Sequence, residues 1–189
     1  MTGFRSDAVV ALGANLSSAA GPPARTLVAA VAALARAGPT IRAVSRFYAT
    51  PCFPAGAGPD YVNAAVRIAT TLPPDRLLAV LHGVEARFGR QRRRRWGQRT
   101  LDLDLICMGD MVLPDAATLR AWIDLPAADQ ARQAPERLLL PHPRLQDRAF
   151  VLAPMADLVP GWRHPLLDRT VAGMYAALTG KETGAVRPL

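Results

Sequence analysis

The most informative part of the chain reads Arg95-Trp-Gly-Gln-Arg-Thr-Leu-Asp-Leu-Asp-Leu-Ile106. Its second half alternates apolar and acidic residues, which is the two-residue period of a β-strand. In such a strand, Asp102 and Asp104 project from one face while the neighbouring leucines point to the other. The alternation therefore predicts a half-buried strand over 100–108 with two carboxylates on its open face.

The paired carboxylates and the arginines before them predict a cation and phosphate site. Two ionised carboxylates on one face repel each other, and a cation between them removes that cost. Mg²⁺ suits such oxygen ligands and completes its octahedron with water and substrate phosphates. Arg90 and the run Arg92–Arg95 lie just upstream, and guanidinium groups bind phosphate in a bidentate way. A nucleotide site is favoured; a solvated acid pair and a solvated basic loop stay open as alternatives.

The segments around this stretch predict an alternation of strands and helices. Apolar runs predict four strands, at residues 8–12, 41–48, 61–70 and 100–108. Helical spacing after prolines predicts two helices between them, at 22–37 and 73–88. The order βαββαβ is typical of a ferredoxin-like α+β sandwich, an antiparallel sheet with helices on one face. The open face would carry Tyr61, Asn63, Asp102 and Asp104.

The chain beyond the fourth strand is expected to complete one domain over 1–180. Residues 111–137 look like an excursion, with a short helix after Asp115. It could cover the nucleotide end of the site or pack Trp122 against the body, and packing is favoured. We expect two more short helices near 150–158 and 171–178. Residues 181–189 are expected to form a loose tail.

Composition bounds the class of protein. The 189 residues are 50% hydrophobic, which suits one globular domain. A net charge of +8 favours an anionic partner, but 22 of the 23 basic residues are arginine, so the excess can also reflect genome composition. No apolar run approaches the roughly 20 residues of a membrane span, and the N-terminus does not resemble a signal peptide. Cys52 and Cys107 form no disulfide framework or zinc signature, so we expect a cytoplasmic protein with reduced thiols.

Four other residues and one missing motif bear on the chemistry. The amide of Asn63 offers a donor and an acceptor, which suits the lactam edge of a heterocycle. Glu85 interrupts an apolar stripe and is most simply a surface residue. Trp96 suits a core anchor or a stacking platform, and His142, between two prolines, is by itself more typical of a structural histidine. The only lysine is Lys181 and no Gly-x-x-x-x-Gly-Lys-Ser/Thr motif occurs, so phosphoryl transfer here must use arginine and Mg²⁺ rather than a P-loop.

Five sequence blocks occur in order along the chain: Ala11-Leu-Gly-Ala-Asn15-Leu, Phe47-Tyr-x-Thr50-Pro51, Pro59-Asp-Tyr61-Val-Asn63-Ala, Arg95-Trp96-Gly-x-Arg99-Thr-Leu-Asp102-Leu-Asp104 and Leu140-Pro-His142-Pro-x-Leu-x-x-Arg148-x-Phe150-Val. With them the chain resembles the 6-hydroxymethyl-7,8-dihydropterin pyrophosphokinase family of folate biosynthesis, from about residue 9 to about residue 168. The resemblance implies ATP-dependent transfer of a diphosphate to the hydroxymethyl group of the pterin, with release of AMP. It also implies a monomer whose partners are small molecules, not nucleic acid or membrane.

The resemblance also implies a role for each site residue. Two Mg²⁺ ions would be held by Asp102 and Asp104, which together with Arg90 and Arg92 would be the catalytic residues. The pterin would be bound by Thr50, Pro51, Phe53, Tyr61, Asn63, Trp96 and Phe150. ATP would be bound by Glu85, Arg92, Trp96, Arg99, His142 and Arg148. The chain departs from some members in two places, Pro143 where a tyrosine stands and the longer excursion at 111–137.

Two rival interpretations share the same sheet. A two-metal nuclease or polymerase-like site needs a third acidic ligand, and the first three predicted strands offer no obvious candidate. An RNA-binding module would stack bases on exposed aromatic residues. Its sheet would then place Asp102 and Asp104 beneath the phosphates, which is unfavourable without a metal.

Overall fold

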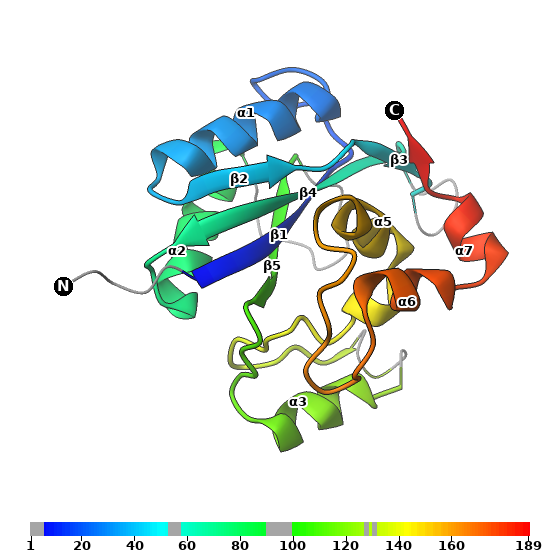
Figure 1. Ribbon diagram of the computed structural model, residues 1–189. Helices are drawn as coiled ribbons and strands as arrows, with labels where there is room; N and C mark the ends of the chain where they lie inside the picture. The colour runs from blue at the N-terminus through cyan, green and yellow to red at the C-terminus, as the bar shows by residue number, and fades with distance from the viewer. Residues whose placement is uncertain (1–5, 53–57, 90–99, 127–128, 130–131) are drawn as a thin grey trace.

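The computed structural model describes residues 6–52, 58–89, 100–126, 129 and 132–189 (Figure 1). One sheet runs through the molecule in the order β5-β1-β4-β3-β6, and β2 also pairs with β4. All of these pairs are antiparallel. The strands are β1 (Ser6–Ala14), β2 (Thr40–Val44), β3 (Tyr48–Thr50), β4 (Tyr61–Thr70), β5 (Asp102–Met108) and β6 (Arg187–Pro188).

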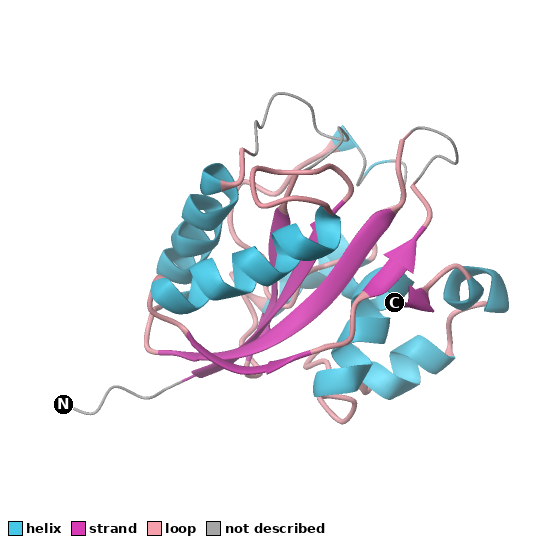
Figure 2. Cartoon of the chain, turned by 90° about the horizontal axis from the view of Figure 1, so that it is seen from above, coloured by secondary structure: helices cyan, strands magenta, loops and turns pink. Residues whose placement is uncertain are grey.

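Two long helices cover one face of the sheet (Figure 2). They are α1 (Pro23–Arg36) and α2 (Pro74–Arg87), and each has proline in its first turn, where the missing N–H costs no helical hydrogen bond. Alternate residues of β1, β4 and β5 form the first core with them, among them Leu12, Val66 and Leu103. The predicted βαββαβ order and the α+β class are confirmed, and β5 and β4 have the predicted alternation.

The opposite face is partly covered as well, which the expectation of helices on one face did not include. Helices α5 (Ala149–Leu158) and α6 (Val171–Ala176) pack there in a second core with Val9, Ala65 and Ile106. The reason is visible in α5, where six of ten residues are buried. A helix that is apolar on most sides is stable only against a second surface.

The segment predicted as one strand at 41–48 is divided into β2 and β3. Ser45 lies at the break, where its backbone N–H donates to the carbonyl of Ala65 and its Oγ accepts from the N–H of Ala65 at 2.9 Å. The Ser45 hydroxyl therefore replaces a backbone partner at the point where β2 stops pairing with β4. The chain pairs with β4 again at β3, which lies against the first residues of β4.

The described parts of the excursion and the C-terminus both contain secondary structure. The predicted short helix is α3 (Ala116–Ile123), which begins at Asp115, whose side chain accepts from the N–H of Thr118. A 3-10 turn, η1 (Leu145–Asp147), precedes α5. The expectation of a loose tail is wrong, because α7 (Gly180–Gly184) and β6 follow α6 and β6 pairs with β3.

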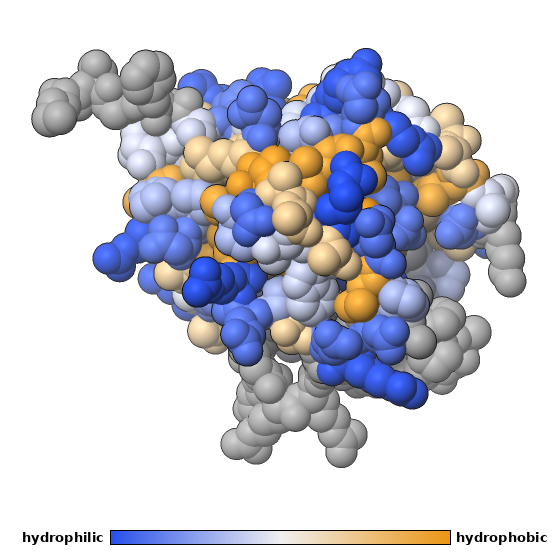
Figure 3. Space-filling model, turned by 90° about the horizontal axis from the view of Figure 1, so that it is seen from below, coloured by the Kyte–Doolittle hydropathy of each residue, from blue (hydrophilic) through white to orange (hydrophobic). Residues whose placement is uncertain are grey.

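The surface mixes apolar and polar areas. Seen from below, hydrophobic side chains gather near the middle of the face and hydrophilic ones surround them (Figure 3). Within the part of the chain that the structure describes, no helix has the length and apolar character needed to cross a membrane.

Candidate active site

The register of the sheet places three site positions in one row across adjacent strands. Gly13 on β1 pairs with Asn63 on β4 and, on its other side, with Asp102 on β5. Because side chains alternate along a strand, these positions face the same side as Ala65 and Ile106, the side where α5 packs. Asn63, predicted to bind a heterocycle, and Asp102, predicted to bind a cation, therefore lie on one face with Gly13 between them.

The acid pair lies on the edge strand of this row. Asp102 and Asp104 are both half-buried, whereas Leu103 between them is buried on the other face. The side chain of Asp104 is 40% exposed, and its Oδ2 lies 3.9 Å from a guanidinium nitrogen of Arg148. The two carboxylates share a face as the alternation predicted, and the cationic side chain of Arg148, just before α5, lies close to Asp104.

The N-terminal end of α5 adds an aromatic ring to the same area. Arg148 precedes the helix, and its guanidinium carbon lies 5.7 Å from the centre of the Phe150 ring. Phe150 is 40% exposed, which is unusual for so large an apolar side chain. One short segment therefore presents a positive charge toward the acids and an exposed aromatic face beside it.

Asn63 is held by a neighbour on the adjoining strand. Its Nδ2 donates to Oγ1 of Thr50 at 2.7 Å, and both residues are buried. This contact fixes the amide, so that Oδ1 points away from Thr50. Tyr61 is half-buried and pairs with Thr50 in the ladder. Pro51, the residue after Thr50, is exposed. Thr50, Tyr61 and Asn63 therefore lie together in one group.

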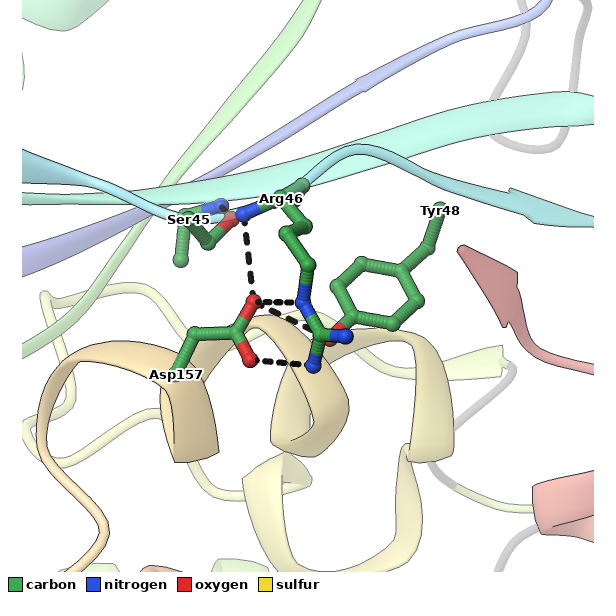
Figure 4. A network of polar contacts seen from close by, with 5 residues as sticks. Ser45, Arg46, Tyr48 and Asp157 are labelled. Carbon is green, nitrogen blue, oxygen red and sulfur yellow. Dashed lines mark hydrogen bonds and ion pairs between the residues drawn. The ribbon is translucent and has the colours of Figure 1, made fainter. Parts of the chain in front are cut away.

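A polar network of four hydrogen bonds joins Arg46 and Tyr48, at the start of β3, to α5 (Figure 4). The carboxylate of Asp157 accepts from the backbone N–H, Nε and a terminal nitrogen of Arg46, at 3.1, 3.2 and 2.7 Å, and from the hydroxyl of Tyr48 at 3.0 Å. Burial pushes the pKa of Asp157 upward, but these hydrogen bonds outweigh it and the pKa lies below its ordinary value. The network holds α5, which carries Phe150, against the strand that carries Thr50.

His142 approaches the acid pair as a neutral group. Burial lowers its pKa to about 3, and the positive charges of Arg148 and Arg144 act in the same direction. Its Nδ1 accepts from the backbone N–H of Arg144 at 3.1 Å, so the proton of the neutral ring is on Nε2. The ring also senses the negative charge of Asp102. His142 is thus suited to donate one hydrogen bond from Nε2.

Glu85 differs from the simplest interpretation of its sequence. The surface position suggested for it is wrong, because it is 1% exposed. Its Oε1 accepts from the N–H of Leu103 at 2.7 Å. It therefore contacts the backbone between the two acids.

Part of the predicted site lies outside the described residues, namely Phe53, Arg90, Arg92, Trp96 and Arg99. Among the remaining candidates, the structure brings together two groups, one at Thr50, Tyr61 and Asn63 and one at Asp102, Asp104, His142 and Arg148. No cluster of three or more histidine, cysteine or acidic side chains suited to a metal occurs in the described part of the chain.

Three contributors were not identified from the sequence. Gly13 and Asn15 belong to one of the quoted blocks, and Asn15 is buried and donates to the carbonyl of Pro59 at 3.2 Å, beside Tyr61. That block was therefore the available signal. Asp157 had none, because its partner Arg46 lies 111 residues away along the chain.

Comparison with known proteins identifies the same family along most of the chain. The family model described as 7,8-dihydro-6-hydroxymethylpterin-pyrophosphokinase (HPPK) matches residues 9–160. The 2-amino-4-hydroxy-6-hydroxymethyldihydropteridine pyrophosphokinase of Synechocystis is 38% identical over 165 residues, 87% of this chain and 72% of the relative. The enzyme of the same name from Pseudomonas aeruginosa is 38% identical over 157 residues, 82% of each chain.

Solved structures are similar in fold. Wild-type HPPK-DHPS of Plasmodium falciparum has a TM-score of 0.63 at 14% identity, covering 92% of this chain and 44% of that chain. An HPPK-DHPS solved in complex with substrates has a TM-score of 0.66 at 13% identity, over 92% of this chain and 43% of that chain. This chain therefore spans less than half the length of those solved chains, and the likeness supports the α+β fold alone.

Proposed function

Because the chain belongs to the 7,8-dihydro-6-hydroxymethylpterin-pyrophosphokinase family, we propose that it transfers the β,γ-diphosphate of ATP to 6-hydroxymethyl-7,8-dihydropterin and releases AMP, a step of folate biosynthesis. One observation supports this most directly. Asn63 and Asp102 face the same side of the sheet, with Gly13 between them in register. A heterocycle bound at Asn63 would thus lie on the same face as the acid pair, two strands away.

Mg²⁺ is the cation that fits the acid pair. Asp102 and Asp104 supply two half-exposed carboxylates on one face of β5, and the donors are all oxygen. Two protein carboxylates leave most of an octahedral shell for water and for ATP phosphates, which is the usual arrangement for Mg²⁺. When bound there, Mg²⁺ neutralises charge on the transferred phosphoryl group and on the leaving oxygen. We propose two ions at this site, as the resemblance implies.

The other residues would bind and orient the two substrates. Asn63 would read the amide edge of the pterin, with its orientation set by Thr50. Tyr61 and the exposed Phe150 would offer ring faces to the pterin. Aromatic faces on either side of a flat heterocycle leave its edge as the feature that distinguishes it from others.

The nucleotide end would rely on donors and positive charge. Arg148 would bind phosphate when ATP is present, and neutral His142 would donate from Nε2 to a phosphate oxygen. Arg90, Arg92, Trp96 and Arg99 keep their expected roles as proposals from the sequence. The pterin hydroxyl oxygen would then bond to the β-phosphorus as the bridging oxygen leaves with AMP. We assign no side chain as the base, because correct positioning of a primary alcohol supplies much of the rate.

Product analysis tests the proposal. Purified protein is incubated with ATP, Mg²⁺ and the pterin, and AMP and pterin diphosphate are expected in equal amounts. Asp102→Asn should reduce turnover about a hundredfold or more, because one charged ligand of the ions is removed. Asp110→Asn is the matched control, since Asp110 is exposed just beyond β5. EDTA should abolish turnover and added Mg²⁺ should restore it.

Other products would refute the assignment. ADP in place of AMP would mean single phosphoryl transfer. No pterin-dependent turnover, together with salt-sensitive and Mg²⁺-independent RNA binding, would favour the RNA-binding alternative. The expected monomer and the expected cytoplasmic location stay predictions, and sedimentation of the purified protein tests the first.

A further inference from the structure

Glu85 is a buried carboxylate behind the acid pair. It lies near the end of α2 and is 1% exposed, so almost none of its surface is accessible to a ligand. Burial of a carboxylate is unfavourable unless hydrogen bonds compensate for the lost water. One such bond is the 2.7 Å contact between Glu85 Oε1 and the N–H of Leu103. This oxygen of the carboxylate is thus directed at the protein backbone.

The register of β5 explains why this N–H needs a partner. Among the described residues the sheet ends at β5, which there has a ladder only with β1. In an antiparallel pair the N–H groups of successive residues point alternately toward and away from the neighbouring strand. Leu103 pairs with Leu12, and Asp102 and Asp104 on either side of it pair with Gly13 and Ala11. The N–H of Leu103 points to the open edge, where Glu85 receives it.

The backbone of the acid pair is therefore held from both edges. The ladder with β1 fixes one edge, and the Glu85 carboxylate fixes the other at the residue midway between Asp102 and Asp104. A charged acceptor makes this a stronger hydrogen bond than a neutral one. The distance between the two acidic side chains depends on this short segment remaining extended.

We propose that Glu85 is a positioning residue of the cation site and not a nucleotide contact, a role that rests on the proposed function. It holds β5 extended, so that Asp102 and Asp104 present their carboxylates together. Its negative charge also raises the affinity of the acid pair for divalent cations. This departs from the ATP-binding role that the resemblance implies for Glu85.

Two substitutions separate the two parts of this role. Glu85→Gln keeps an oxygen that accepts from Leu103 but removes the charge, whereas Glu85→Ala removes both. Asp75→Asn is the matched control, because Asp75 is an exposed acid in the first turn of the same helix. The first measurement is hydrogen exchange of the Leu103 amide, and the second is binding of Mn²⁺ alone, followed by its electron paramagnetic resonance signal.

We expect Glu85→Ala to speed exchange of the Leu103 amide by about tenfold or more, since a charge-assisted hydrogen bond is lost. Mn²⁺ binding and the Mg²⁺ requirement of turnover should both weaken by about tenfold. Glu85→Gln should keep the amide protected and weaken cation binding severalfold. The KM for ATP at saturating Mg²⁺ should change less than about twofold in both variants.

Three results would overturn the proposal. An unchanged Leu103 amide in Glu85→Ala would remove the positioning role, and an unchanged Mn²⁺ affinity in Glu85→Gln would remove the electrostatic one. A raised KM for ATP with a normal Mg²⁺ requirement would make Glu85 a nucleotide contact. Exchange and Mn²⁺ binding need no turnover, so they remain decisive even if the wild-type protein makes no pterin diphosphate. If Glu85→Ala does not fold, Glu85→Gln still tests the cation affinity.

Discussion

Gly13 of β1 lies against the amide oxygen of Asn63, and a Cβ atom at position 13 would come within 3.1 Å of Asn63 Oδ1. The glycine is therefore explained by space, because its backbone is not among those with positive φ. Asn63 is also fixed by Thr50 and has little freedom to move aside. The placement of Oδ1 thus depends on three residues on three strands, Gly13, Thr50 and Asn63.

Gly13→Ala should raise the KM for the pterin by about tenfold, because one hydrogen bond of the Asn63 amide is displaced. The KM for ATP should change little. Gly83→Ala is the control, since Gly83 lies within α2 with nothing within 4 Å of an added Cβ. It should keep normal kinetics and gain about 0.5–1 kcal/mol in free energy of unfolding. Equal kinetic effects in the two variants would contradict this explanation.

Substitutions of His142 can distinguish its two nitrogens. Glutamine places an amide near Nε2 and keeps the donor toward phosphate, whereas asparagine places an oxygen near Nδ1 and keeps only the contact with Arg144. We expect His142→Gln to keep the kcat within about tenfold and His142→Asn to lose more, in line with the cost of a phosphate donor. Steady-state kinetics with ATP varied measures this. The reverse order would mean that the backbone turn is the important contact.

Asp157→Asn should loosen α5 relative to β3, since three of the contacts come from one arginine. Phe150 on α5 and Thr50 on β3 would then be less well aligned, so we expect a higher KM for the pterin and an unchanged KM for ATP. The low pKa of Asp157 adds a pH test. A carboxylate with a lowered pKa stabilises the fold above its ordinary value of 3.8 and loses that effect as the pH falls toward its folded-state pKa.

The loss of stability between pH 7 and pH 3 should therefore be larger in the wild type than in Asp157→Asn. Thermal unfolding at pH 7 and at pH 3 measures it. The exchange Asp168→Asn is the control, because Asp168 pairs with Arg163 at an exposed site, with side chains 87% and 58% accessible. Exposed ion pairs contribute little to stability. A variant at position 157 with the stability of wild type at both pH values would show that the network does not hold α5.

His164 predicts a second effect of pH on stability. It is fully buried, its Nδ1 accepts from the N–H groups of Leu166 and Leu167, and burial lowers its pKa to about 4. Between pH 4 and its ordinary value of 6.5, the unfolded chain binds a proton that the folded protein does not. The free energy of unfolding should therefore rise with pH in this window, by at most about 1.4 kcal/mol per pH unit. Denaturant unfolding of wild type and His164→Asn measures the difference in slope, and parallel slopes would refute it.

The sequence was sufficient where a short period carries the information. The alternation through Asp102 and Asp104 predicted β5 and the face of both acids, and the same argument placed Asn63 opposite Val62 and Val66 on β4. The prolines before α1 and α2 marked both helix starts. Each of these inferences needs only neighbours within one turn or two strand residues.

Contacts between distant segments could not be predicted in this way. The burial of Glu85 depends on the open edge of β5, and the role of Asp157 depends on an arginine in another part of the chain. The prediction of a loose tail was wrong for the same reason, since nothing within 181–189 indicates that Arg187 pairs with Ala49. The local sequence pattern predicts a helix or strand, but only the folded structure shows which distant residues contact it.

The row formed by Asn63, Gly13 and Asp102 also sets a length. Neighbouring strands lie about 4.8 Å apart, so two steps across the sheet separate the first and last of these positions by about 10 Å. If Asn63 binds the pterin edge and Asp102 binds the cation, the alcohol of a substrate must lie at that span from the edge that is recognised. A substrate with a longer or shorter arm between ring and alcohol would be bound and yet react slowly. The length of that arm would therefore select the substrate through kcat and not through affinity.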